Sequence, residues 1–142
     1  MKPIWFYLLA AGTSLVDASN VLAAGSNFTT IDFPGAKATQ AWGISPRGVI
    51  VGFYVAPDSS NHGFLLSGNQ YNGVDYPGAA LTLVNGIGSQ DDIAGEYALT
   101  STGPHHGFLL SKGKFTTIDY PGATTTSAIG TDGAGCGGGE QA

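Results

Sequence analysis

The nine residues Phe28-Thr-Thr-Ile-Asp-Phe-Pro-Gly-Ala36 occur three times in the chain, with small changes. They return as Tyr71-Asn-Gly-Val-Asp-Tyr-Pro-Gly-Ala79 and as Phe115-Thr-Thr-Ile-Asp-Tyr-Pro-Gly-Ala123, at spacings of 43 and 44 residues. A second motif, His62-Gly-Phe-Leu-Leu-Ser67, returns unchanged from His106 to Ser111. Self-similarity at one fixed period is typical of repeat architectures. The body of the chain is therefore predicted to be a repeat of about 43 residues.

Each copy is predicted to contain four short strands. Proline presets the first turn angle and glycine accepts a positive φ at the next position, so Phe33-Pro-Gly-Ala36 predicts a type II turn. The expected strands of the first copy are Phe28 to Phe33, Ala38 to Ile44, Val49 to Val55 and His62 to Ser67. Four strands in about 43 residues is the size of a propeller blade. We expect an all-β fold of repeated four-stranded antiparallel units, similar to β-propeller blades in an incomplete ring.

A comparison of the copies predicts which strand faces are buried. In the second copy, Ile93, Gly95 and Tyr97 alternate with the polar or small residues Asp92, Ala94 and Glu96, which predicts one buried and one solvated face. The first copy has Val49, Val51 and Phe53 at the solvated positions. That strand is therefore expected to be covered on both faces.

The third copy is incomplete. Thr126 to Gly130 matches the strand after the Pro-Gly turn, but the sequence from Thr131 onward is rich in glycine and shows no apolar alternation. We expect a repeat domain over residues 25–130, with full copies at 28–70 and 71–114, a partial copy at 115–130, and a disordered tail at 131–142. Single-ring propellers close with four to eight blades. Three alternatives stay open: chains associate, the strands form a smaller open sheet or sandwich, or the sequence is a piece of a longer repeat protein.

Composition restricts the classes of function. The 142 residues carry a formal net charge of −5, and only 11% of them are charged, against about 25% in typical soluble domains. So few basic residues cannot form the cationic surface that a phosphate backbone requires. Nucleic acid is therefore not an expected partner. The 42% hydrophobic and 11% aromatic residues are sufficient for a packed core.

The first 24 residues have the pattern of a secretory signal peptide. Lys2 precedes a short apolar run from Ile4 to Ala11, and small residues follow at Ala23 and Ala24. Gly12 and Asp17 interrupt the run too early for a membrane span of about 20 residues. We expect a signal-peptide helix that is removed after Ala23 or Ala24, and a mature protein that is extracellular or periplasmic with no membrane span.

Cys136 is the only cysteine, so the exported fold is expected to have no internal disulfide. Its role is left open between an incidental residue of the tail and a disulfide between chains.

The combined motifs resemble a known bacterial repeat. Gly-Ile, Gly-x-Ile-Val-Gly-x-Tyr, His-Gly-Phe-Leu and Phe-Thr-Thr-Ile-Asp-Tyr-Pro-Gly-Ala together resemble the extracellular HAF-type repeat family, with His62-Gly-Phe64 and His106-Gly-Phe108 at the place of its His-Ala-Phe core. The resemblance covers Phe28 to about Gly130, and departs in the glycine of the core and in the number of copies. It implies a secreted, propeller-like protein and implies no particular reaction.

His62 and His106 are the most obvious candidates for chemistry, as binding residues. Each begins the fourth expected strand of its own copy, and a residue present in every unit usually serves that unit, for instance by bonding a loop carbonyl. His105 breaks the symmetry, but side chains of neighbouring strand residues point to opposite faces, so His105 and His106 are not expected to share a metal ion. No metal site and no cofactor are expected.

The aspartates before the Pro-Gly turns are interpreted as structural, because Asp commonly accepts amide protons in turns. A ring of carboxylates that holds a cation or sugar hydroxyls is the functional alternative. The residues assigned to this structural role are Asp32, Asp75, Asp119, Pro34, Pro77, Pro121, Gly35, Gly78 and Gly122.

Signatures of catalysis are weak. Asp91, Asp92 and Glu96 could serve as an acid pair for glycoside chemistry, but they lie in and beside a predicted turn, where solvated acids are ordinary. The sequence has no nucleophile elbow, phosphate loop or paired-cysteine motif. No catalytic residue is therefore assigned.

Aromatic residues are the best binding candidates, because their rings can stack on sugars. The candidates are Trp42, Phe53, Tyr54, Tyr71 and Tyr97, most of them expected in the core. Trp42 has no aromatic counterpart, since Asn85 stands at its place in the second copy.

These observations favour a secreted, non-enzymatic β-repeat module that binds or scaffolds extracellular or cell-envelope material, either glycan or protein. Self-association to complete the ring stays one of the three alternatives given above for the incomplete third copy. Two alternatives remain. One is an exported hydrolase or lyase acting on carbohydrate, and the other is a fragment of a longer repeat protein without a function of its own.

Overall fold

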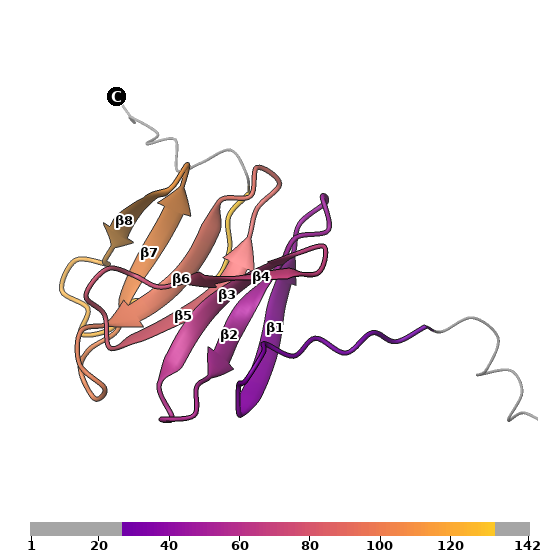
Figure 1. Cartoon of the computed structure of the whole chain (residues 1–142). Coiled ribbons are helices and arrows are strands. Elements are labelled where there is room, and N and C mark those ends of the chain that lie inside the picture. Colours follow the sequence, from indigo (N-terminus) through magenta and orange to yellow (C-terminus); the bar gives the residue numbers. More distant parts are fainter. Residues whose placement is uncertain (1–26, 133–142) are drawn as a thin grey trace, which may run out of the picture. The chain divides into compact units, whose positions relative to one another are not determined.

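The computed structural model describes residues 27–132, and these contain eight strands and no helix (Figure 1). Every strand belongs to one compact unit that begins at Ile31. The expected signal-peptide helix and residues 133–142 of the expected tail lie outside the described residues.

The strands form two four-stranded antiparallel sheets. Sheet A contains β1 (Ala38–Ile44), β2 (Ile50–Val55), β3 (Asn61–Ser67) and β4 (Gln70–Val74) in that order. Sheet B contains β5 (Leu81–Ile87), β6 (Ile93–Ala98), β7 (His106–Ser111) and β8 (Lys114–Ile118) in the same order. The predicted fold class, all-β with repeated four-stranded antiparallel units, is confirmed.

The register is the same in both sheets. Tyr54 lies opposite His62 in sheet A, and Tyr97 lies opposite His106 in sheet B. The first strand of each sheet has an irregularity at the same place, between Ala41 and Gly43 and between Val84 and Gly86. The repetition in sequence is therefore a repetition of cross-strand contacts.

The Pro-Gly turn adopts one geometry in all three copies. Gly35, Gly78 and Gly122 have φ of 77, 78 and 80°, as the third position of a type II turn requires. The turn closes with a hydrogen bond from the amide of the following alanine, for example Ala79 to the carbonyl of Tyr76 at 3.1 Å. A threonine six residues after the aromatic residue then accepts the aromatic residue's amide proton; the pairs are Phe33–Thr39, Tyr76–Thr82 and Tyr120–Thr126.

Two predicted strands are absent, Phe28 to Phe33 and the third-copy segment from Thr126 to Gly130. Phe28 to Phe33 is not a strand, although its counterparts in the second and third copies form β4 and β8. Those two strands pair with β3 and β7 of the preceding copy. Each sheet is thus completed by the opening residues of the next copy. This last strand of a sheet forms where a His-Gly-Phe-Leu-Leu-Ser strand precedes it in the chain and pairs with it.

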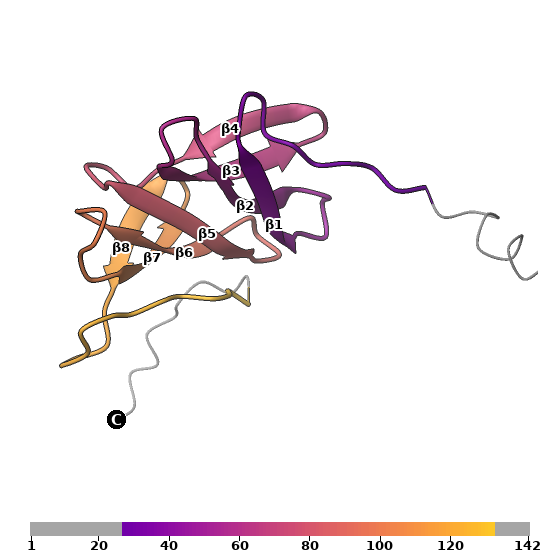
Figure 2. The ribbon, with the colours of Figure 1, turned by 90° about the horizontal axis from the view of Figure 1, so that it is seen from below.

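The two sheets pack against each other through β5, the first strand of sheet B, which contacts β1, β2 and β3 of sheet A (Figure 2). Val51 and Val84 are fully buried between the sheets, and the core continues through Val74 and Phe108. A Cβ atom at Gly63 would lie 2.7 Å from Val84 Cγ2, so the absence of a side chain at Gly63 permits this close approach.

The burial pattern confirms one prediction and corrects another. Val51 is fully buried and Phe53 is half-buried, so the face of β2 that was expected to be covered is covered. The face of β6 that was expected to be solvated is not, because Asp92 and Ala94 are 8% and 1% exposed. Thr131, directly after the third copy, lies at this face, with its Oγ1 3.5 Å from the carbonyl oxygen of Asp92.

Candidate functional site

Each sheet carries a cluster of four side chains in contact. Two aromatic rings stack, a histidine lies beside the second ring, and an aspartate lies beside the histidine. In sheet B, the ring of Tyr76 stacks on Tyr97 with 3.6 Å between centroids and 2° between planes. His106 lies 5.3 Å from Tyr97 on the neighbouring strand, and its Nδ1 is 2.9 Å from an oxygen of Asp119. The four residues come from the Pro-Gly turn, β6, β7 and the residue after β8.

Sheet A repeats this cluster one unit earlier. Phe33 stacks on Tyr54 at 3.7 Å and 4°, His62 lies 5.4 Å from Tyr54, and His62 Nδ1 is 3.1 Å from Asp75. The structure therefore brings Tyr54 and His62 together, and Tyr97 and His106 together, but each pair stays within its own sheet.

The pKa values of Tyr76 and Tyr97 are shifted in opposite directions. Both hydroxyl groups reach Thr117 Oγ1, Tyr76 at 2.9 Å and Tyr97 at 3.0 Å. Burial raises the pKa of Tyr97, whereas the hydrogen bond with Thr117 lowers the pKa of Tyr76. With 6% of its surface exposed, Tyr97 stacks inside the unit rather than facing solvent.

The histidine–aspartate pairs were missed by the sequence reasoning, which gave each residue a separate backbone partner. The available signal was co-repetition: both residues recur in two copies at a separation of 13. Asp32 precedes the first such histidine, and its stretch pairs with no strand in residues 27–132.

Trp42 lies apart from these clusters. It sits at the irregularity of β1, is 60% exposed, and its ring is 6.4 Å from Phe53. Asn85, its counterpart on β5, donates from Nδ2 to Ala128 O and Ser127 Oγ, both at 3.2 Å. The position of Trp42 is therefore occupied in sheet B by a residue that contacts the next unit.

A third arrangement involves Ser60, which the sequence analysis did not single out. Its Oγ is 2.8 Å from His62 Nε2, and the other ring nitrogen of His62 faces Asp75. Pro104 stands at the corresponding place in the second copy, so this serine breaks the repeat symmetry. Ser60 also contacts Asp58 Oδ1 through Oγ at 2.5 Å and through its backbone amide at 3.0 Å. These hydrogen bonds lower the pKa of Asp58.

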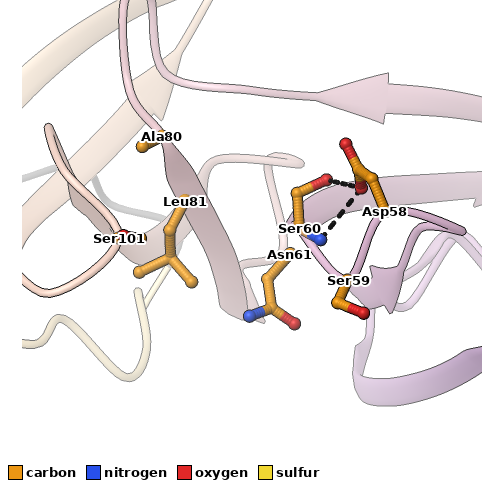
Figure 3. A pocket seen from close by; sticks show the side chains of 7 residues that line it. All are labelled: Asp58, Ser59, Ser60, Asn61, Ala80, Leu81 and Ser101. Carbon is orange, nitrogen blue, oxygen red and sulfur yellow. Dashed lines mark hydrogen bonds between the residues drawn. The ribbon is translucent and has the colours of Figure 1, made fainter.

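A hollow of about 270 Å³ lies beside Ser60. Figure 3 shows Asp58 and Ser60 on one side of it and Ala80, Leu81 and Ser101 on the other. The lining is mostly small and polar.

Asp91 and Glu96, considered above for glycoside chemistry, contact different partners. Asp91 adopts a positive φ of 63° and its Oδ2 is 2.6 Å from Arg47 Nη1, which joins the hairpin turns of the two sheets. Glu96 bonds to His105 Nδ1 at 3.0 Å, while the neighbouring His106 bonds to Asp119. In residues 27–132, no three metal-binding side chains gather at one place.

The third copy extends the repeat beyond sheet B. The amide of Thr126 donates to His105 O at 2.8 Å, and a Cβ at Gly86 would lie 3.2 Å from Gly130 Cα. One unit earlier, a Cβ at Gly43 would lie 3.4 Å from Gly86 Cα. Thr126 to Gly130 therefore holds the position on sheet B that β5 holds on sheet A. Tyr120, the counterpart of Phe33 and Tyr76, is 73% exposed.

Comparisons with protein-family models, with curated proteins and with solved structures found no match. The resemblance to the HAF-type repeat therefore stays a prediction. In the described part of the chain, no helix is long and apolar enough to cross a membrane.

Proposed function

We propose that this protein is a secreted, non-enzymatic scaffolding module that works by stacking further repeat units onto its own. The observation that carries the proposal is the exposure of the Tyr120 side chain. The two preceding rings of the series, Phe33 and Tyr76, each stack on a tyrosine of the following sheet, but most of the Tyr120 surface is exposed.

The surroundings of Tyr120 support the same function. Ile129, in the segment that occupies the β5-like position, is 76% exposed. Tyr120 and Ile129 therefore give the third copy two exposed apolar side chains for a further unit to cover. Repeat proteins are stabilised by contacts between neighbouring units, so a unit added at this end would gain what sheet B gains from sheet A.

A chain extended by one more unit tests this proposal. Residues 131–142 are replaced by a second copy of residues 87–130, which supplies a complete third sheet after Gly130. We expect a higher melting temperature and one cooperative transition, because each added interface contributes stability. A matched extension that carries Tyr120→Ala should gain less. An extended chain that melts at or below the temperature of the original would contradict the proposal.

Export is the second part of the proposal and rests on the N-terminal pattern of the sequence. Expression of the full sequence in a bacterial host should give a periplasmic or extracellular product. Its intact mass should correspond to cleavage after Ala23 or Ala24. A full-length product retained in the cytoplasm would contradict export.

An exported hydrolase is the second candidate, favoured by the chain of contacts from Ser60 through His62 to Asp75. In this alternative, His62 accepts the proton of Ser60 while Asp75 orients the ring. The contacts of Ser60 with Asp58 argue against it, because they engage both the hydroxyl and the backbone amide. The side chains of His62 and Asp75 are also 33% and 48% exposed.

A fluorophosphonate probe, which labels activated serines, separates the two candidates. The scaffolding proposal predicts equal, background labelling of the protein and of its Ser60→Ala variant. Labelling of Ser60 that disappears in this variant, together with turnover of an ester such as an acetylated glycan, would establish the hydrolase instead.

A further inference from the structure

Residues Thr126 to Gly130 are arranged like a first strand whose second strand is missing. Their place on sheet B is fixed by the contacts with His105, Asn85 and Gly86 described above. Thr126 also accepts the amide proton of Tyr120 at 3.0 Å, as Thr82 does for Tyr76 before β5 begins. The segment is therefore held in a strand-like arrangement, without a strand partner in residues 27–132.

The two complete sheets define what such a partner must look like. Thr39 lies opposite Tyr54 and Thr82 opposite Tyr97, and in each case that tyrosine receives the ring of the Pro-Gly turn. By the same register, a tyrosine opposite Thr126 would meet the exposed ring of Tyr120.

The partner must also carry glycine two residues before this tyrosine. A Cβ at Gly52 would overlap the carbonyl oxygen of Gln40, and a Cβ at Gly95 would overlap that of Leu83. Ser127 is the counterpart of Gln40 and Leu83 in the third copy, so its carbonyl oxygen would face the partner's glycine. A strand with any larger residue at the glycine position could not approach closely enough to pair.

We propose that Tyr120 and the Thr126–Gly130 segment form a docking edge for an antiparallel strand of the type Ile-x-Gly-x-Tyr, supplied by another polypeptide of this repeat type. This inference rests on the proposed scaffolding function and names its partner. Strand addition of this kind takes affinity from main-chain hydrogen bonds and specificity from side-chain positions.

The partner is a strand that is free to pair, not the folded body of a second copy. This chain has two Ile-x-Gly-x-Tyr strands, β2 and β6, and both are already paired on both sides. A second copy would have to open one of its own sheets to offer either of them. A segment that has not yet joined a sheet carries no such cost.

The test uses a synthetic hairpin with the sequence of residues 47–67, which contains β2 and β3 and has one basic and one acidic side chain. Its near-neutral charge avoids repulsion from a protein of net charge −5. The hairpin is titrated into ¹⁵N-labelled protein purified after expression of the full sequence. We expect saturable binding, with the largest chemical-shift changes at Tyr120 and Thr126–Gly130.

Two variants report on the predicted contacts. Tyr120→Ala in the protein should weaken binding by about 2- to 12-fold, the range expected for one aromatic pair. Gly52→Ala in the hairpin should abolish binding. Ile44→Thr, an exposed position on β1, and Ser59→Ala in the hairpin loop serve as matched controls and should bind like the originals.

Binding that ignores both Tyr120→Ala and Gly52→Ala, or no saturable binding, would overturn the inference. Self-association that needs Tyr120 and excludes the hairpin would make a second copy the occupant and overturn it as well. If the extended chain described above is stabilised while the hairpin does not bind, the inference falls and the scaffolding function stands. If the extension also fails to stabilise, both fall.

Discussion

At the scale of single residues, the repeat is held together by a tyrosine with ring contacts on two sides. Tyr97 stacks on Tyr76 from the preceding turn and lies against His106 of the neighbouring strand. Tyr54 has the same two kinds of neighbour in sheet A, Phe33 and His62. Aromatic pairs of this kind contribute about 0.5–1.5 kcal/mol beyond the area that they bury. The turn residue therefore joins one unit to the next.

Tyr54 gives a prediction for alkaline pH. Burial, and then the charge of Asp75, raise the pKa of Tyr54 above its ordinary value of 10.0. The folded state thus holds this proton more tightly than the unfolded state. The resulting stability is complete below pH 10 and is lost as the pH rises through the folded pKa. Tyr54→Phe should make the melting temperature fall less steeply between pH 9 and 11.

The control is Tyr71→Phe, on β4 of the same sheet. Equal pH dependence in the wild type and in Tyr54→Phe would contradict the assignment.

Sequence reasoning reached the turn residues but not the side-chain pairs. Pro-Gly specifies a backbone angle by itself, so the turns at Gly35, Gly78 and Gly122 could be predicted locally. The pair of His106 and Asp119 depends on β7 and β8 lying side by side, because these residues are 13 positions apart in the chain. Ser60 was missed for a related reason, since its contacts come from a loop with no counterpart pattern in the second copy.

At the scale of elements, small residues set the distance between the sheets. Gly63 on β3 lies against Val84 of β5, and its counterpart Gly107 on β7 lies against the third copy, where a Cβ would be 3.2 Å from Thr126 Cγ2. The glycine of the His-Gly-Phe motif is therefore a packing residue in both complete units.

Gly63→Ala should destabilise the protein. The added Cβ would lie 2.7 Å from Val84 Cγ2 and would overlap the carbonyl oxygen of Val74, so a strand must move. We expect a loss of about 1–3 kcal/mol in the free energy of unfolding, the usual cost of overpacking, measured by urea denaturation. Gly73→Ala on β4 is the matched control, because a Cβ there meets no atom within 4 Å. The packing argument would be wrong if the two substitutions had equal effects.

Most strands could be predicted, because Gly-x-Tyr and His-Gly-Phe-Leu-Leu-Ser alternate with recognisable turns. Phe28 to Phe33 was one exception: its sequence is almost identical to that of β8, yet it forms no strand. A strand requires a neighbour, and this stretch precedes the first β3-like segment of the chain. Local sequence alone cannot supply that information.

At the scale of the whole molecule, residues 27–132 contain two complete sheets and the start of a third unit that packs on the second sheet. The repeat period predicted this order, but not the burial of Asp92 and Ala94. Their polar and small side chains resemble a solvated face, but the segment after Tyr120 lies beside them, with Thr131 Oγ1 3.5 Å from the carbonyl oxygen of Asp92. The alternation pattern cannot distinguish small residues that face water from small residues that admit a close neighbour.

The most direct test of this account compares the melting temperatures of two chains, one ending at Gly122 and one ending at Asp132. They differ only in the segment that packs on sheet B. If that segment acts as the first strand of a third unit, the shorter chain loses its contacts with Gly86, Gly107 and His105. We predict a melting temperature lower by about 4–8 °C, which corresponds to about 1 kcal/mol in a domain of this size. Equal melting temperatures would contradict the claim that the repeat continues past sheet B.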